Sequence, residues 1–68
     1  MSEKFAKNLE RLRTERKMTQ EELAKRVGVS QPAIAQFEAG KNTPKLYVTI
    51  KLAEVLGTTI DDLVTHKD

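Results

Sequence analysis

Apolar residues recur along this chain at the spacing of helices that bury one face. In the first 17 residues they lie four and three positions apart, with polar and charged residues between them. This spacing predicts an amphipathic helix from Ser2 or Glu3 to about Lys17. The residues of this helix expected to face the core are Phe5, Leu9 and Leu12.

Two further helices are predicted within residues 19–39, where start and stop signals are densest. Thr19 and Glu22 form a capping box that opens a helix at Gln20, because the threonine hydroxyl accepts from the amide three residues on while the glutamate reaches back. The residues on the face expected to be buried are Leu23, Ala24 and Val27.

The chain turns sharply between these two helices. Gly28 ends the first, because glycine adopts positive φ without steric cost, and Ser30 offers its hydroxyl as the next N-cap. Pro32 follows in the first turn, where a missing N–H costs no hydrogen bond. The inner face of the second helix carries Ile34 and Phe37. So short a connection makes the helices cross, which predicts a helix-turn-helix over about residues 19–39.

The last third of the chain predicts two more helices. One runs from about Leu46 to Leu56 and stops at Gly57, and a short one follows the Thr59 cap. The residues of the longer helix expected to point inward are Leu46, Ile50, Ala53 and Leu56. No strand pattern or interdomain linker is evident, so residues 1–68 are interpreted as a single all-α domain of five helices.

Composition narrows the class of protein. The chain has 68 residues, 38% apolar content and no cysteine, so its core is small and has no disulfide or cysteine metal site to support it. No apolar run reaches the roughly 20 residues that span a bilayer, and the N-terminus lacks the apolar core of a signal peptide. A cytoplasmic protein without membrane contact is expected.

Catalytic, metal and cofactor chemistry find no support in the sequence. His66, the only histidine, is interpreted as a solvated residue and not as a metal ligand. Asp61 and Asp62 are interpreted as favourable charge in the first turn of the last helix, not as an acid and base pair. We therefore expect no enzyme, no cofactor and no small-molecule ligand.

The charge of the chain is mild but uneven. The net charge is +2, and residues 1–41 hold nine Lys or Arg against six Asp or Glu, whereas residues 42–68 hold three against four. The basic excess lies in the half with the helix-turn-helix. On charge alone a solvated mixed surface is the better interpretation, since nucleic-acid footprints usually show a stronger bias.

The motifs together resemble the Cro-like, lambda-repressor-like (XRE-type) helix-turn-helix family of bacterial and phage transcription regulators. The residues that carry the resemblance are Thr19 to Ala24, Val27 to Ser30, Ile34, Phe37, Glu38, Gly40, Pro44, Leu52, Ala53, Leu56 and Gly57. It covers about Leu9 to Leu63. The resemblance implies a five-helix domain that binds a double-stranded DNA operator, commonly as a homodimer on two half-sites, and most simply acts as a repressor.

The resemblance to this family implies that the helix after Ser30 enters the major groove. The residues opposite its inner face are the candidate base contacts: Gln31, Pro32, Ala35 and Gln36. Glutamine pairs bidentately with adenine, and apolar groups suit the thymine methyl. We therefore expect A·T pairs in each half-site.

Two places are expected to hold the DNA backbone. Gln20 and the amides of its helix's first turn offer N–H groups and partial positive charge to a phosphate. Lys41 and Asn42 are the second candidate clamp. Lys45 is a further candidate, and Tyr47 suits either a backbone contact or a dimer contact. The family likeness puts dimer contacts near Gly57 and Thr58, and near Pro44 and Lys45.

Glu38 is unusual, because phosphates would repel a carboxylate on a groove-facing helix. It lies four residues after Ile34, so it is expected to point back towards the first helix and to pair with Arg13. The family has a similar arginine–glutamate pair between its first and third helices. The pair is predicted to hold the groove-facing helix in place.

A second class of function stays open from the sequence. The mild charge and the absence of arginine on the groove face also fit an antitoxin or accessory protein-interaction module, whose apolar last helix binds a partner and whose DNA binding is secondary.

Overall fold

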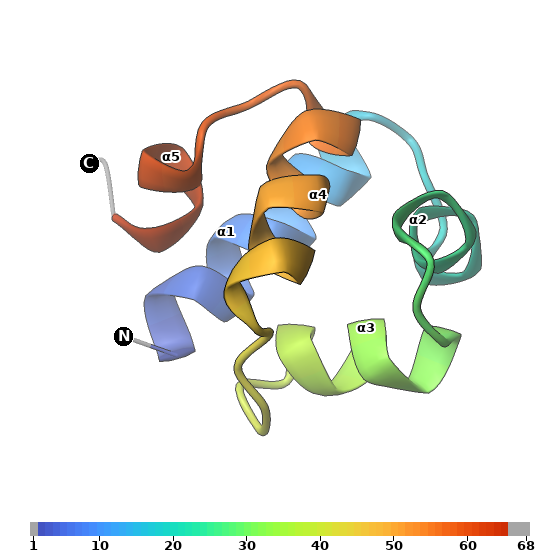
Figure 1. The fold of residues 1–68 in the computed structure, drawn as a ribbon, viewed down its shortest axis with the longest axis horizontal. Helices are drawn as coiled ribbons and strands as arrows, with labels where there is room; N and C mark the ends of the chain where they lie inside the picture. Colours follow the sequence, from blue (N-terminus) through green and yellow to red (C-terminus); the bar gives the residue numbers. More distant parts are fainter. Residues whose placement is uncertain (1, 66–68) are drawn as a thin grey trace.

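The computed structural model describes residues 2–65, which form five helices (Figure 1). These are α1 (Ser2–Glu15), α2 (Gln20–Val27), α3 (Gln31–Glu38), α4 (Leu46–Leu56) and α5 (Ile60–Val64). No strand occurs among these residues, so the predicted all-α fold with five helices is confirmed. In the same part of the chain, no helix is long and apolar enough to cross a membrane. His66 lies outside the described residues.

All five helices contribute to one core. The fully buried large side chains are Leu9, Leu23, Ile34, Leu52, Leu56 and Leu63. Burying each contributes about 1.5–3 kcal/mol relative to leaving it exposed. α1 contacts both α3 and α5, while α2 contacts α3 and α4. In Figure 1, α4 crosses in front of α1, and α3 forms the lower edge of the protein with no helix beyond it.

α1 ends two residues earlier than the sequence pattern indicated. Its last residue is Glu15, and Lys17 then adopts a left-handed conformation with φ of 58°. The amide of Met18 donates to the Arg13 carbonyl at 3.2 Å, which closes the end of the helix. The apolar period continues towards Met18, but the chain has already turned to reach the Thr19 cap.

The predicted inner face of α4 was partly wrong. Leu46 and Ile50 are 69% and 41% exposed, whereas Val48, Thr49 and Leu52 are buried. Ala53 and Leu56 are buried as predicted. Apolar residues lie on almost every side of this helix, so the spacing alone did not determine which face packs on the core.

Thr49 is a buried polar residue on the inner side of α4. Its hydroxyl donates to the Lys45 carbonyl at 3.2 Å, and Lys45 itself caps α4 without a side-chain hydrogen bond. A cavity of about 350 Å³ opens beside Thr49. It is lined by Phe5, Thr43, Pro44, Leu46, Thr49, Ile60 and Val64. An open groove lined mainly by apolar residues therefore lies between the start of α4 and α5.

Asn8 attaches the short α5 to α1, which the sequence analysis missed. Its side chain is buried, and its Nδ2 donates to the carbonyls of Leu63 and Thr65 at 2.9 and 2.7 Å. The last carbonyls of a helix lack partners within the helix, so this amide satisfies two of them. A polar residue on the inner face of α1 was the available signal.

Candidate nucleic-acid interface

The turn between α2 and α3 is set by two local hydrogen-bonded motifs. Gly28 has φ of 88°, and its amide donates to the Ala24 carbonyl at 2.8 Å. The amide of Ala33 then donates to the Ser30 hydroxyl at 3.2 Å, which starts α3. Both predicted caps are present. In Figure 1, α2 is seen nearly end-on while α3 lies in the plane, so the two helices cross steeply.

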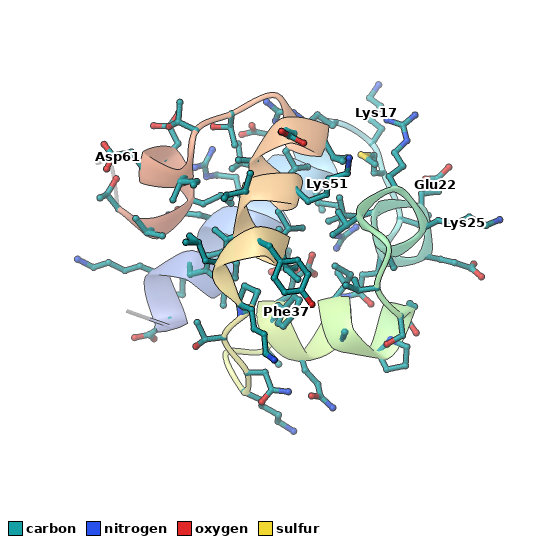
Figure 2. The ribbon with its side chains drawn as sticks, in the orientation of Figure 1. Lys17, Glu22, Lys25, Phe37, Lys51 and Asp61 are labelled. Carbon is teal, nitrogen blue, oxygen red and sulfur yellow. The ribbon has the colours of Figure 1, made fainter. Side chains whose placement is uncertain are left out.

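One face of α3 is left bare by its neighbours. Ile34 is fully buried and Phe37 is 8% exposed, and Phe37 points from α3 into the protein in Figure 2. On the other side, Gln31, Pro32 and Gln36 are exposed, and Ala35 is half-buried. The four predicted base-contact residues therefore lie on a surface that no other helix covers.

Arg13 and Glu38 form the predicted ion pair between α1 and α3. Arg13 Nε donates to Glu38 Oε2 at 2.7 Å, and the guanidinium also donates to Oε1 at 3.1 Å. Their side chains are only 12% and 5% exposed. The hydrogen bond to Glu38 raises the pKa of Arg13 above its ordinary value, although burial acts in the opposite direction. A third bond from Arg13 to the Met18 carbonyl, at 2.7 Å, ties in the start of α2.

Two glutamines extend this ion pair to the surface. Gln20 Nε2 donates to Glu38 Oε1 at 3.0 Å, and Gln31 Nε2 donates to Gln20 Oε1 at 2.7 Å. The sequence analysis assigned Gln20 to a phosphate and Gln31 to a base, but it missed the hydrogen bond between them. Each is the first residue of its helix, directly after a cap, and this shared position was the available signal.

A second amide pair lies at the other end of α3. Asn42 Nδ2 donates to Gln36 Oε1, and the Lys41 amide donates to the Gln36 carbonyl at 3.0 Å. These bonds fold the start of the following loop back onto α3, so that Lys41 and Asn42 lie next to Gln36. Lys41 and Asn42 are both exposed. The structure therefore places Gln36, a candidate base contact, next to Lys41 and Asn42, the candidate backbone clamp.

An open hollow of about 490 Å³ lies at the start of α2. It is lined by Arg13, Thr19, Gln20, Glu21 and Gln31. The Thr19 hydroxyl accepts from the Glu22 amide at 3.0 Å. The amides that precede Glu22 in the first turn have no acceptor within the helix. Such amides bind anions, while the carboxylate of Glu21 opposes an anion at the same place.

Comparison with known proteins identifies the fold and its family. Residues 9–63 match the helix-turn-helix family. The chain is a member of the XRE-type helix-turn-helix family. A solved helix-turn-helix structure, the restriction-modification controller protein C.AhdI from Aeromonas hydrophila, is 31% identical and superposes with a TM-score of 0.87 over 91% of this chain and 94% of its own.

Two helix-turn-helix relatives align over 64 residues, which is 94% of this chain. The transcriptional repressor RstR of the cryptic phage CTXphi in Vibrio cholerae is 36% identical, and the alignment covers 58% of it. The transcriptional activator BcrR of Enterococcus faecalis is 34% identical, and the alignment covers 31% of it. The resemblance inferred from sequence motifs is therefore correct, and both relatives are regulators of transcription.

Truncating Arg13 should destabilise this helix-turn-helix domain strongly. Arg13→Ala leaves the Glu38 carboxylate buried without its counter-charge, and such losses cost about 3–5 kcal/mol. Arg11→Ala is the matched control, because Arg11 pairs with Glu15 at 3.4 Å through side chains that are 53% and 55% exposed. That change should cost under about 1 kcal/mol. Chemical denaturation followed by circular dichroism measures both, and equal losses would contradict the structural role of Glu38.

Proposed function

We propose that this protein is a sequence-specific regulator that binds double-stranded DNA by inserting α3 into the major groove. The bare polar face of α3, held in place by the buried Arg13–Glu38 pair, is the observation that carries the proposal. A groove about 12 Å wide accepts one helix. The names of the relatives, which are transcriptional regulators, support the same assignment, as does the family.

Four side chains of α3 are the proposed base contacts. Gln31 and Gln36 offer amides that match the N6 and N7 edge of adenine, while Pro32 and Ala35 offer apolar contact to thymine methyl groups. Their exposure supports the proposal, with Ala35 the least accessible of the four. Half-sites rich in A·T pairs are the consequence.

The DNA backbone is proposed to be held at both ends of α3. Gln20 donates to Glu38 through one hydrogen of its Nε2, and the second hydrogen stays available for a phosphate beside the first amides of α2. Lys41 contributes charge from the loop after α3, and Asn42 a second amide. Such contacts position a protein on DNA without selecting its sequence.

Two copies are proposed to act together on adjacent half-sites. A single recognition helix buries only about 600–1,000 Å², so one copy gives modest affinity. At the start of α4, next to the loop that follows α3, three large apolar side chains are exposed: Leu46, Tyr47 and Ile50. This apolar ridge supports a contact on the Pro44 and Lys45 side more than at Gly57 and Thr58.

Repression by occupying a promoter is the proposed outcome of binding, as in the repressor RstR. The activator BcrR is similar to this chain over 64 residues, so the position of the operator relative to the promoter decides whether binding represses or activates transcription. A reporter gene placed behind the selected operator distinguishes the two. We also propose a cytoplasmic location, where the DNA is.

The apolar ridge also supports a second candidate, a protein-interaction module in which DNA binding is secondary. The two proposals differ in how binding depends on salt. A pure interaction module, which would bind a partner through Leu46, Tyr47 and Ile50 and would not bind DNA, would give no salt-dependent shift with DNA.

Selection from a random DNA pool tests the main proposal. We expect enriched sequences with two A·T-containing half-sites about 10 base pairs apart, because dimers place two recognition helices one helical turn apart. Affinity should fall steeply as salt rises, since phosphate contacts release counterions. Enrichment of G·C-only half-sites would contradict the base contacts, and the absence of any salt-dependent binding would favour the interaction module.

Removing the Lys41 charge should weaken binding to every sequence alike. Lys41→Ala loses one phosphate contact, so the slope of log affinity against log salt should drop by about 1. Lys51→Ala removes the same charge from α4, on which Figure 2 labels Lys51, and should leave that slope unchanged. Lys51 Nζ lies 3.8 Å from Glu54 Oε1. Fluorescence anisotropy at several salt concentrations measures both variants. Identical slopes for the two variants would show that Lys41 does not contact the DNA backbone.

Tyr47→Ser should separate the two roles that remain open for this side chain. Tyr47 is 71% exposed, so the stability of the folded protein should change little. If Tyr47 joins two copies, binding to DNA with both half-sites weakens while binding to a single half-site is unaffected. Gel-shift titration on the two DNAs measures the difference. Equal weakening on both would assign Tyr47 to the DNA backbone instead.

A further inference from the structure

The chain of hydrogen bonds from Arg13 to Gln31 has a fixed direction. We propose that Glu38 is a positioning residue that sets the base preference of Gln31, acting through Gln20. This inference rests on the proposed DNA-binding function and adds to it the residue that decides which base edge Gln31 accepts.

The direction originates at the carboxylate of Glu38. A carboxylate only accepts hydrogen bonds, and Glu38 accepts from Arg13 at 2.7 Å on one oxygen and from both Arg13 and Gln20 on the other. Gln20 must therefore turn its NH₂ group inward, because its carbonyl oxygen in that place would face a negative charge. Hydrogen bonds to ionised groups are roughly twice as strong as neutral ones, so this orientation is held firmly.

The orientation of Gln20 then determines that of Gln31. With its nitrogen bound to Glu38, Gln20 presents Oε1 to Gln31, and only the NH₂ group of Gln31 can satisfy that oxygen. The observed bond has this sense, from Gln31 Nε2 to Gln20 Oε1 at 2.7 Å. One of the two N–H groups of Gln31 is thereby used within the protein.

What remains of the Gln31 amide is one N–H donor and one carbonyl acceptor. Adenine presents the complementary pair in the major groove, the N7 acceptor and the N6 amino donor. Guanine presents two acceptors, N7 and O6, so the Gln31 oxygen would face O6 without a hydrogen. The chain that starts at Glu38 therefore favours adenine and opposes guanine at this position.

Replacing Glu38 by glutamine should remove the fixed direction of the chain. Arg13 donates to both carboxylate oxygens of Glu38, and Gln20 donates to one of them. In Glu38→Gln, either orientation of the new amide therefore loses one hydrogen bond from Arg13. In one orientation Gln20 still donates to residue 38, whereas in the other Gln20 accepts from residue 38 and donates to Gln31 Oε1. The second orientation leaves both N–H groups of Gln31 facing outward, the arrangement that suits N7 and O6 of guanine.

The experiment measures the ratio of affinities for adenine and guanine at the base pair that Gln31 contacts. This base pair is found as the one whose preference is lost in Gln31→Ala. For the wild-type protein we expect adenine to be favoured by about 5- to 150-fold, the usual range for one bidentate contact. In Glu38→Gln the ratio should fall towards one, because both orientations of Gln31 are then available. A purely structural Glu38 would weaken binding to both sequences by the same factor and leave the ratio unchanged.

Gln20→Met provides a second variant that keeps the ion pair. It has similar volume and no hydrogen-bonding amide, so Gln31 regains its second N–H and the ratio should fall to within about 3-fold of one. Adding Glu38→Gln to Gln20→Met should not change the ratio further, because both act through the same bond. If Gln20 served only as a phosphate contact, Gln20→Met would weaken binding to both DNAs equally, and that result would overturn the proposal.

Nuclear magnetic resonance of the free protein separates this inference from the DNA-binding proposal. One side-chain N–H of Gln31 should exchange slowly with water in the wild type and rapidly in Gln20→Met. Failure of the wild type to bind DNA selectively would refute the proposed function while leaving this signature intact. Selective binding by the wild type, with unchanged ratios in both Glu38→Gln and Gln20→Met, would refute the role of Glu38.

Discussion

The buried ion pair between Arg13 and Glu38 is the constraint on which the placement of α3 depends. It joins the first helix to the third, and its third bond, to the Met18 carbonyl, also fixes the entry to α2. Removing two charges from water is costly, and apolar pairs of equal volume are often at least as stable. What an apolar pair lacks is direction. The carboxylate of Glu38 imposes a donor and acceptor sense on the amides that surround it, and that sense reaches the surface.

Both ends of α2 and the start of α3 could be predicted from the sequence because the chemistry that makes them is local. The Thr19 and Glu22 box, the Ser30 cap and the left-handed Gly28 each act within three or four residues, and all are present. The Arg13–Glu38 pair was predictable for a different reason. A carboxylate on a helix otherwise suited to bind DNA must be neutralised, and only α1 offered a suitable arginine close to it.

The sequence could not predict which face of α4 packs on the core, nor which residues form the long-range hydrogen bonds. In α4, apolar residues at positions 46, 48, 50, 52 and 53 surround the helix, so only contact with the other helices selects Val48 and Leu52 over Leu46 and Ile50. The bond between Gln20 and Gln31 joins the starts of two helices, and Asn8 reaches carbonyls at the far end of the chain. Amides have no periodic signature, and their partners depend on tertiary geometry alone.

The two ends of α3 differ in how freely their base contacts can change. Gln31 is connected through Gln20 to a buried charge that also holds the domain together, so altering its orientation by changing Glu38 disturbs the ion pair. The side chain of Gln36 accepts a hydrogen bond from Asn42 in an exposed pair, and Pro32 is exposed. A change of operator preference at Gln36 or Pro32 therefore leaves the ion pair intact, whereas one directed by Glu38 does not. Within one short helix, one end has its specificity coupled to stability and the other does not.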